Sequence, residues 1–145
     1  MPVQFQLVSG FLCERMLIER DGVQTAIRLV DIFFVREIPG RVPIVQFFAV
    51  VMLKGLPQEQ GFVVSFSMIK PAGKKDQLPK LPNQPSKLEM FENDPSVPTG
   101  VTIVVEINLE PAELGTYYLA VEVDGGEVLR IPFTLRKKPL ADQGH

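Results

Sequence analysis

The stretch Val101–Leu135, VTIVVEINLEPAELGTYYLAVEVDGGEVLRIPFTL, decides the fold class of this chain. Apolar residues occupy every second position in three successive segments, which begin at Val101, Tyr117 and Leu129. A period of two places alternate side chains on the same face of a β-strand. The stretch therefore predicts three consecutive strands, each with one strongly apolar face.

The length of the loop between the last two of these strands follows from whether the paired residues have odd or even numbers. Residues directly opposite in an antiparallel pair share a face, and both apolar sets carry odd numbers, so odd must pair with odd. A two-residue loop at Asp124-Gly125 or Gly125-Gly126 pairs odd with even. We therefore predict the three-residue loop Asp124-Gly125-Gly126, with a glycine in the left-handed conformation. The predicted pairs are Val121 with Leu129, Leu119 with Ile131, and Tyr117 with Phe133.

The approach to the middle strand resembles the corner that enters strand F of immunoglobulin-type domains. There an acidic residue and a glycine precede a tyrosine, and a cysteine follows two residues later. Here Glu113, Gly115 and Tyr117 match, whereas Leu119 stands in place of the cysteine. With one Cys and no Trp, the chain lacks the disulfide and tryptophan of true immunoglobulin domains. The resemblance implies an Ig-like sandwich, although a tyrosine at any sandwich corner explains it equally.

The remainder of the chain extends this pattern into an all-β fold. We predict an antiparallel β-sandwich, Ig-like, of about seven to nine strands and with no substantial helix. Its 145 residues suit a single domain over residues 1–136, followed by a flexible tail over 137–145. An irregular proline-rich connection occupies residues 70–100. The further predicted strands are Phe11–Glu19, Thr25–Val35 with a bend near Asp31, Val42–Leu53, Phe62–Ile69 and the short Leu88–Phe91.

Asp21-Gly22 predicts a hairpin between the first two of these strands. A two-residue loop pairs Ile18 with Thr25 and Met16 with Ile27, which gives a consistent apolar face. This register also places Arg15 opposite Arg28, two like charges that destabilise the pair.

Composition limits the partners and the compartment. The net charge of −2 leaves no basic surplus to release counterions from nucleic acid, so we predict no nucleic-acid partner. The N-terminal residues lack a signal-peptide pattern, and the apolar run Val42–Leu53 is too short for a membrane helix. Cys13 is the only cysteine, so no internal disulfide can form. We expect a cytoplasmic protein with no membrane partner.

Residues that carry catalysis or bind metals are scarce. The only histidine, His145, is the last residue, which disfavours serine–histidine and cysteine–histidine arrangements and most zinc sites. We interpret Cys13 as a core residue rather than an activated thiol. The segment Glu92-Asn93-Asp94 lacks the spacing of a calcium loop. We therefore predict no catalytic residues, no metal and no cofactor.

Surplus apolar surface is the remaining functional signal. The run Val42–Leu53 is apolar on both faces, whereas a sandwich strand usually keeps one face in water. A second copy, another protein or the chain's own 70–100 connection could cover the outer face. The candidate interface residues are Ile44, Gln46, Phe48, Val50, Met52, Tyr118 and Ala120.

Two groups of turn and core residues together resemble a family of small bacterial proteins known only as a domain of unknown function. The first group contains Cys13-Glu14-Arg15 and Asp21-Gly22, and the second contains Gly115, Tyr117, Asp124-Gly125 and Ile131-Pro132-Phe133. The resemblance implies a bacterial β-sandwich and no catalytic residues.

The functional hypothesis is a non-enzymatic protein-binding or assembly module, bacterial and homo-oligomeric through its apolar sheet surface. The alternative is a small-ligand binder or enzyme with a site between the sandwich end and the 70–100 connection. Phage and secretion assemblies, which use small sandwiches as adaptors, offer a third possibility by fold analogy.

Overall fold

The protein is an all-β structure. The computed structural model describes residues 3–18, 20, 23–35, 39–40, 43–77, 84–110 and 113–137. Ten strands and no helix occur in these ranges, which confirms the predicted all-β fold class, although about seven to nine strands were predicted. The strands are β1 (Leu7–Ile18), β2 (Gln24–Leu29), β3 (Ile32–Val35), β4 (Val45–Gly55), β5 (Phe62–Ile69), β6 (Lys75–Gln77), β7 (Gln84–Ser86), β8 (Thr99–Leu109), β9 (Gly115–Val123) and β10 (Gly126–Lys137).

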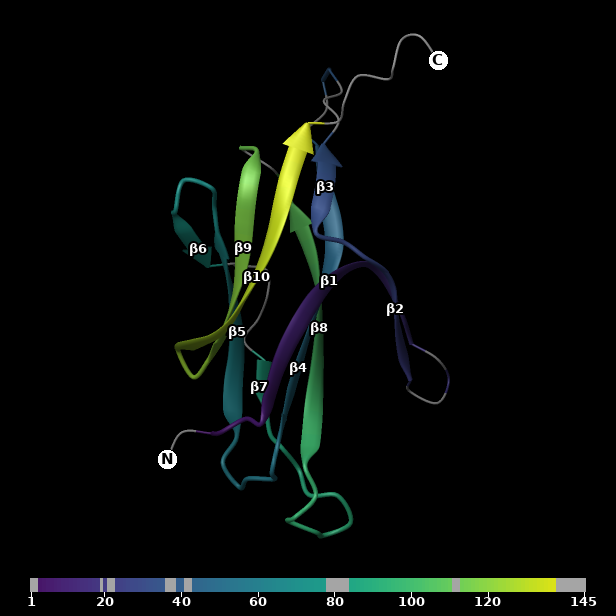
Figure 1. Ribbon diagram of the computed structural model, residues 1–145, viewed down its shortest axis with the longest axis vertical. Helices are drawn as coiled ribbons and strands as arrows, with labels where there is room; N and C mark the ends of the chain where they lie inside the picture. The colour runs from purple at the N-terminus through teal and green to yellow at the C-terminus, as the bar shows by residue number, and fades with distance from the viewer. Residues whose placement is uncertain are drawn as a thin grey trace.

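The strands form two sheets that pack face to face (Figure 1). One sheet has four strands in the order β2-β1-β4-β8, and the other has six, in the order β3-β10-β9-β5-β6 with β7 also paired to β5. The segment Thr25–Val35 was predicted as one strand with a bend near Asp31, but it forms two strands, because the chain leaves β2 after Leu29, crosses to the other sheet and enters β3. The Val30 amide donates to Leu12 O at 3.0 Å and the Thr134 amide donates to Asp31 O at 2.9 Å, so the crossover is held to both sheets. β3 pairs with β10 in parallel, whereas the other strand pairs are antiparallel.

The core lies between the inner faces of the two sheets. The odd-numbered residues of β4 and β8 point inwards from one sheet and meet the odd-numbered residues of β9 and β10 from the other. An aromatic cluster fills one end: the ring centroids of Phe47 and Phe133 are 5.2 Å apart, and Phe33 contacts both rings. The alternation read from the sequence therefore assigns inner and outer faces correctly in these strands.

The β9–β10 hairpin has the predicted strand pairs but not the predicted loop. Leu129 lies opposite Val121, and the two other predicted pairs also form. The loop has two residues, however, because Gly126 already pairs with Val123. Asp124 and Gly125 both have positive φ, 49° and 85°, as a type I′ turn requires. A bulge at Val128, where the register shifts between Glu127 and Leu129, restores the odd-with-odd pairing that a two-residue loop alone would break.

Tyr117 forms the corner that the sequence predicted. Its hydroxyl donates to the carbonyl oxygen of Glu113 at 2.5 Å. The ring is buried and stacks on Phe133, with centroids 5.4 Å apart. Tyr117 is therefore a structural residue that fixes the entry to β9.

The register of the first hairpin differs from the prediction by one residue. Ile18 lies opposite Gln24, and Met16 lies opposite Ala26, rather than opposite Thr25 and Ile27. The predicted register was wrong because it set Arg15 against Arg28. In the structure Arg28 instead pairs with Glu14, with 3.3 Å between Nη1 and Oε2. The predicted turn residues Asp21 and Gly22 lie outside the described residues.

The 70–100 connection contributes to the fold, although the strand predicted at Leu88–Phe91 does not form. Two three-residue strands, β6 and β7, pair with β5 instead. Leu88 is buried in the core, and its carbonyl oxygen accepts a hydrogen bond from the Gln58 amide at 3.1 Å. The predicted tail began one residue too early, since Lys137 still pairs with Val35 in the β10–β3 ladder. Residues 138–145 lie outside the described residues.

Candidate functional site

The predicted interface residues lie on opposite sides of the sandwich. Gln46, Phe48, Val50 and Met52 point outwards from β4, in the four-stranded sheet. Tyr118 and Ala120 point outwards from β9, in the six-stranded sheet. They therefore do not form one patch with the β4 residues. Strand parity predicts the face of a strand on which a side chain lies, but it does not predict which sheet the strand joins.

The outer face of the four-stranded sheet is apolar at its centre. Val50 lies opposite Phe11 of β1 on one side and Val104 of β8 on the other. Phe48 lies next along β4 on the same face, opposite Cys13. We call this surface the apolar face, and it consists of Phe11, Cys13, Phe48, Val50, Met52 and Val104. Phe11 and Cys13 were not among the predicted interface residues, although the odd-numbered apolar positions of β1 carry the same alternating signal.

Two of the predicted interface residues are buried already. Val50 is only 2% exposed at the centre of the apolar face, and Ala120 is fully buried on the other sheet. Neither side chain can supply much contact area to a partner, so both predictions were wrong in that respect. Ile44 precedes β4 and is exposed, and Met52 is 37% exposed. Met52 is thus the β4 residue of the apolar face that a partner can reach most directly.

Polar groups lie at the margins of the apolar face. Gln46 Nε2 donates to Glu106 Oε1 across β4 and β8. Lys54 and Thr102 are exposed at the opposite end of the same face. An apolar centre bounded by polar groups is the usual arrangement of a protein–protein interface.

The outer face of the six-stranded sheet has a different character. Lys75 Nζ lies 2.6 Å from Glu122 Oε1, and the Ser67 hydroxyl donates to the same carboxylate oxygen at 3.4 Å. The Arg130 guanidinium lies 5.7 Å from the centre of the Tyr118 ring and pairs with Glu127 at 3.0 Å. Polar side chains that pair with one another therefore occupy part of this face.

The described parts of the 70–100 connection do not lie over the apolar face. β6 and β7 pair with β5, which belongs to the other sheet, and Leu88 packs in the core. In the part of the chain that the structure describes, the 70–100 connection therefore does not fold back over the apolar face.

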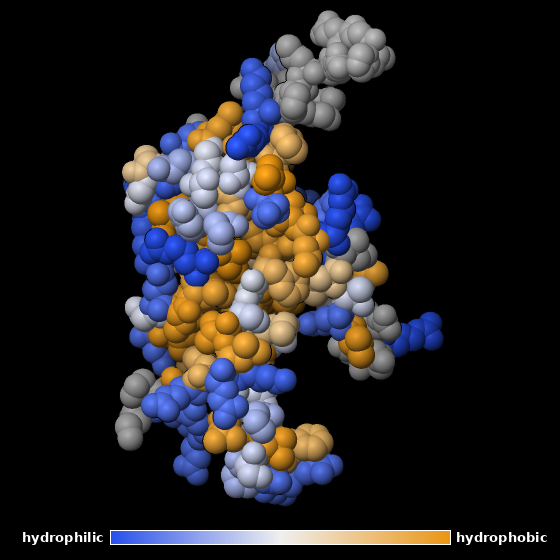
Figure 2. Space-filling model, viewed as in Figure 1, coloured by the Kyte–Doolittle hydropathy of each residue, from blue (hydrophilic) through white to orange (hydrophobic). Residues whose placement is uncertain are grey.

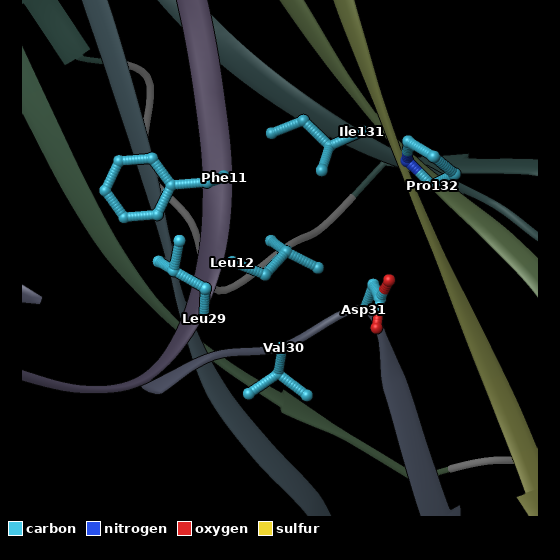
Figure 3. A pocket seen from close by; sticks show the side chains of 7 residues that line it. All are labelled: Phe11, Leu12, Leu29, Val30, Asp31, Ile131 and Pro132. Carbon is cyan, nitrogen blue, oxygen red and sulfur yellow. The ribbon is translucent and has the colours of Figure 1, made fainter. Parts of the chain in front are cut away.

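Two adjoining hollows lie where the chain crosses between the sheets. The first, of about 280 Å³, has apolar walls that include Phe11 and Leu29 on one side of β1 and Leu12 and Ile131 on the other (Figure 3). The second, of about 410 Å³, contains the Glu14–Arg28 pair and shares Leu29 with the first. Neither hollow contains a residue of the 70–100 connection, so they do not support the small-ligand site predicted beside it.

Figure 2 shows how apolar side chains gather across the middle of the molecule, over the region of β1 and β10. Hydrophilic side chains lie towards both ends of this view. The residues that line the first hollow come from β1, the end of β2, the crossover and β10.

The described residues offer little reactive chemistry. No group of three or more His, Cys, Asp or Glu side chains within them could hold a metal ion. Burial raises the pKa of the Cys13 thiol, which disfavours the reactive thiolate at neutral pH. In the segment Glu92-Asn93-Asp94, Asp94 Oδ1 accepts hydrogen bonds from the Ser96 amide at 2.9 Å and the Ser96 hydroxyl at 2.6 Å. That carboxylate oxygen stabilises a turn.

Comparison with known proteins leaves the family open. No protein-family model matches the sequence, and no curated protein matches it. Among solved structures, the chain is similar to the Pseudomonas fluorescens alkylpurine DNA glycosylase AlkC bound to DNA containing an abasic site analogue. The identity is 14% and the TM-score 0.43, over 88% of this chain and 30% of that chain. The resemblance to a bacterial family of unknown function therefore stays a prediction.

The comparison corrects one prediction about partners. We predicted no nucleic-acid partner from the net charge, and that exclusion was wrong, because the similar chain was solved with DNA. The TM-score of 0.43 is too low to argue for any particular partner of this chain.

No helix among the described residues is long and apolar enough to cross a membrane.

Proposed function

We propose that this chain is a non-enzymatic assembly module of a bacterial cytoplasm, which self-associates through its apolar face. The observation that carries the proposal is the contrast between the two outer faces. On the six-stranded sheet, polar side chains pair with one another, as Lys75 does with Glu122. On the four-stranded sheet, Phe11, Phe48 and Val104 remain partly exposed around Val50.

Burial of the apolar face against a second copy removes this surface from water, which is the main favourable term in protein association. The low net charge of −2 supports a second copy as the partner, since two copies repel each other only weakly. Cys13 on the same face is fully buried, so it supplies neither contact area nor a reactive thiol.

The test compares two apolar residues of nearly equal exposure on opposite faces. Met52 is 37% exposed on the apolar face, and Val63 is 38% exposed on the outer face of the six-stranded sheet. We expect Met52→Glu to raise the dissociation constant of the dimer at least about tenfold, because a carboxylate would be buried in an apolar interface. Val63→Glu serves as the matched control and should leave the dimer unchanged.

Sedimentation velocity over a wide range of protein concentrations measures both variants against the wild-type chain. A wild-type protein that is monomeric at every concentration would overturn the proposal. So would equal weakening by Met52→Glu and Val63→Glu, because the effect would then not belong to the apolar face.

A further inference from the structure

β8 is a long edge strand with one side unpaired. β4 pairs with all eleven of its residues, from Thr99 to Leu109, and within the described ranges no strand pairs with its other side. The backbone amides and carbonyls on that side are directed away from the sheet. Such an edge is a ready template for another strand.

The other edges of the two sheets are short or interrupted. β2 has six residues, and Arg28 within it takes a positive φ of 62°. β3 has four residues. β5 is covered in part by β6 and β7, each of three residues, and β7 contains Pro85. These are the usual ways in which proteins protect a sheet edge.

β8 carries none of these protections. Its register with β4 runs without a shift, and it contains no proline and no residue with positive φ. Glu106 is its only charged residue. An edge of this length without such features indicates that pairing is its role.

We propose that β8 pairs antiparallel with β8 of a second copy, about a twofold axis at Val104. In a symmetric antiparallel pair, the sequence numbers of two opposite residues always have the same sum. That sum is even, because opposite residues share a face and residues on one face of β8 are all odd-numbered or all even-numbered. Centring on Val104 is the register that overlaps all eleven residues of the strand. Thr99 then pairs with Leu109 of the partner subunit.

This register also suits the side chains. Glu106 lies opposite Thr102 of the partner subunit, so no like charges face each other. A register centred on Glu106 would set the two Glu106 carboxylates together. On the inner face, Ile103 lies opposite Val105 of the partner subunit, and such β-branched pairs stabilise neighbouring strands.

Edge pairing joins two four-stranded sheets into one sheet of eight strands. The apolar faces of both copies then lie side by side on the same surface of that sheet. This contact is separate from burial of the apolar face, so the two proposals can fail independently.

The first experiment compares two variants that carry charges of opposite sign at the same exposed position, Thr102. Thr102→Lys sets an ammonium opposite Glu106 of the partner subunit, and by symmetry this occurs twice in each dimer. Thr102→Glu sets like charges there instead. We expect sedimentation equilibrium to show a dissociation constant at least about threefold lower for Thr102→Lys and at least about threefold higher for Thr102→Glu, and both shifts should shrink at high salt.

In a contact made only through the apolar face, Thr102 lies at the polar margin, where the sign of a new charge has no fixed partner to meet. Opposite effects of the two variants are therefore specific to the edge register. If both weaken association, or neither changes it, edge pairing is overturned. Met52→Glu, measured alongside, reports separately on the apolar face.

The second experiment is a cross-link at the axis. Val104→Cys in a Cys13→Ser background places two thiols directly opposite each other, at a separation that suits a disulfide. We expect mild oxidation to yield covalent dimer, seen by intact mass, far faster than for Val63→Cys in the same background, since Val63 is exposed on β5 of the other sheet. Equal rates for the two variants would contradict the register.

Discussion

Tyr117 shows how one side chain holds the entry to a strand. Its hydroxyl donates to Glu113 O at 2.5 Å, four residues upstream, while its ring stacks on Phe133 in the core. Burial raises the pKa of the Tyr117 phenol above the value of about 10 that an exposed tyrosine has. The corner therefore depends on a protonated phenol.

The pH dependence of stability follows from this raised pKa. Above pH about 10 the phenol ionises first in the unfolded chain, so the unfolded state binds fewer protons and the free energy of unfolding falls as pH rises through the folded pKa. Tyr117→Phe should cost about 1 kcal/mol at neutral pH, through the lost hydrogen bond, and should remove part of the alkaline slope. Urea denaturation at a series of pH values measures both effects. Tyr118→Phe is the control, and an equal loss of slope in it would contradict this assignment.

Gly10 is a residue whose role no sequence pattern indicates. It lies on the inner face of β1, opposite Val51, and a Cβ atom there would lie 2.7 Å from Leu129 Cδ2 and 2.8 Å from Ile131 Cδ1. Gly10→Ala should therefore lower the free energy of unfolding by about 1 kcal/mol through overpacking, the low end of the usual cost, because the ends of the Leu129 and Ile131 side chains can shift. The double variant Gly10→Ala/Leu129→Ala should recover part of this loss, because the second change makes room for the methyl group. Strictly additive effects in chemical denaturation would show that no overpacking occurs.

At the scale of elements, the β9–β10 hairpin shows what parity can predict. The three predicted pairs formed, because the apolar faces of both strands must meet the core. The loop length was wrong, since Asp124-Gly125 is a favoured type I′ turn and a bulge at Val128 absorbs the odd residue. Parity fixes whether the total number of turn and bulge residues is odd or even. It does not say how many of them lie in the turn and how many in a bulge.

A deletion tests that division. Removal of Val128 deletes the bulge residue, so every pair from Leu129 onwards is retained and the protein should still unfold cooperatively. Removal of Pro132 instead turns Phe133 outward or, if the bulge is lost to compensate, turns Arg130 inward and Ile131 outward, and either outcome should prevent folding. Circular dichroism and thermal melting of the two variants measure the outcome. Similar behaviour of the two deletions would contradict the bulge assignment.

At the scale of the whole molecule, the sequence predicted the fold class but only part of the candidate site. Two-sided apolarity identified β4 as unusual, and the apolar face indeed runs along it. Tyr118 and Ala120 were misplaced, because sheet membership depends on long-range pairing that alternation does not encode. Phe11 belongs to the face because β1 pairs with β4, and the sequence pattern does not reveal this pairing.

The 70–100 connection closes one end of the core, despite its prolines. Leu88 is 1% exposed, and its Cδ1 lies 3.3 Å from the position that a Cβ atom would take on Gly55 of β4. Leu88→Ala should therefore lower the free energy of unfolding by about 2–4 kcal/mol, through lost transfer energy and the cavity left behind. Met90→Ala is the matched control in the same connection, because Met90 is 52% exposed and should cost less than about 0.5 kcal/mol. Urea denaturation of both variants gives the comparison. A connection that merely lies on the surface would make the two costs equal, whereas one that belongs to the core makes Leu88 the larger by several-fold.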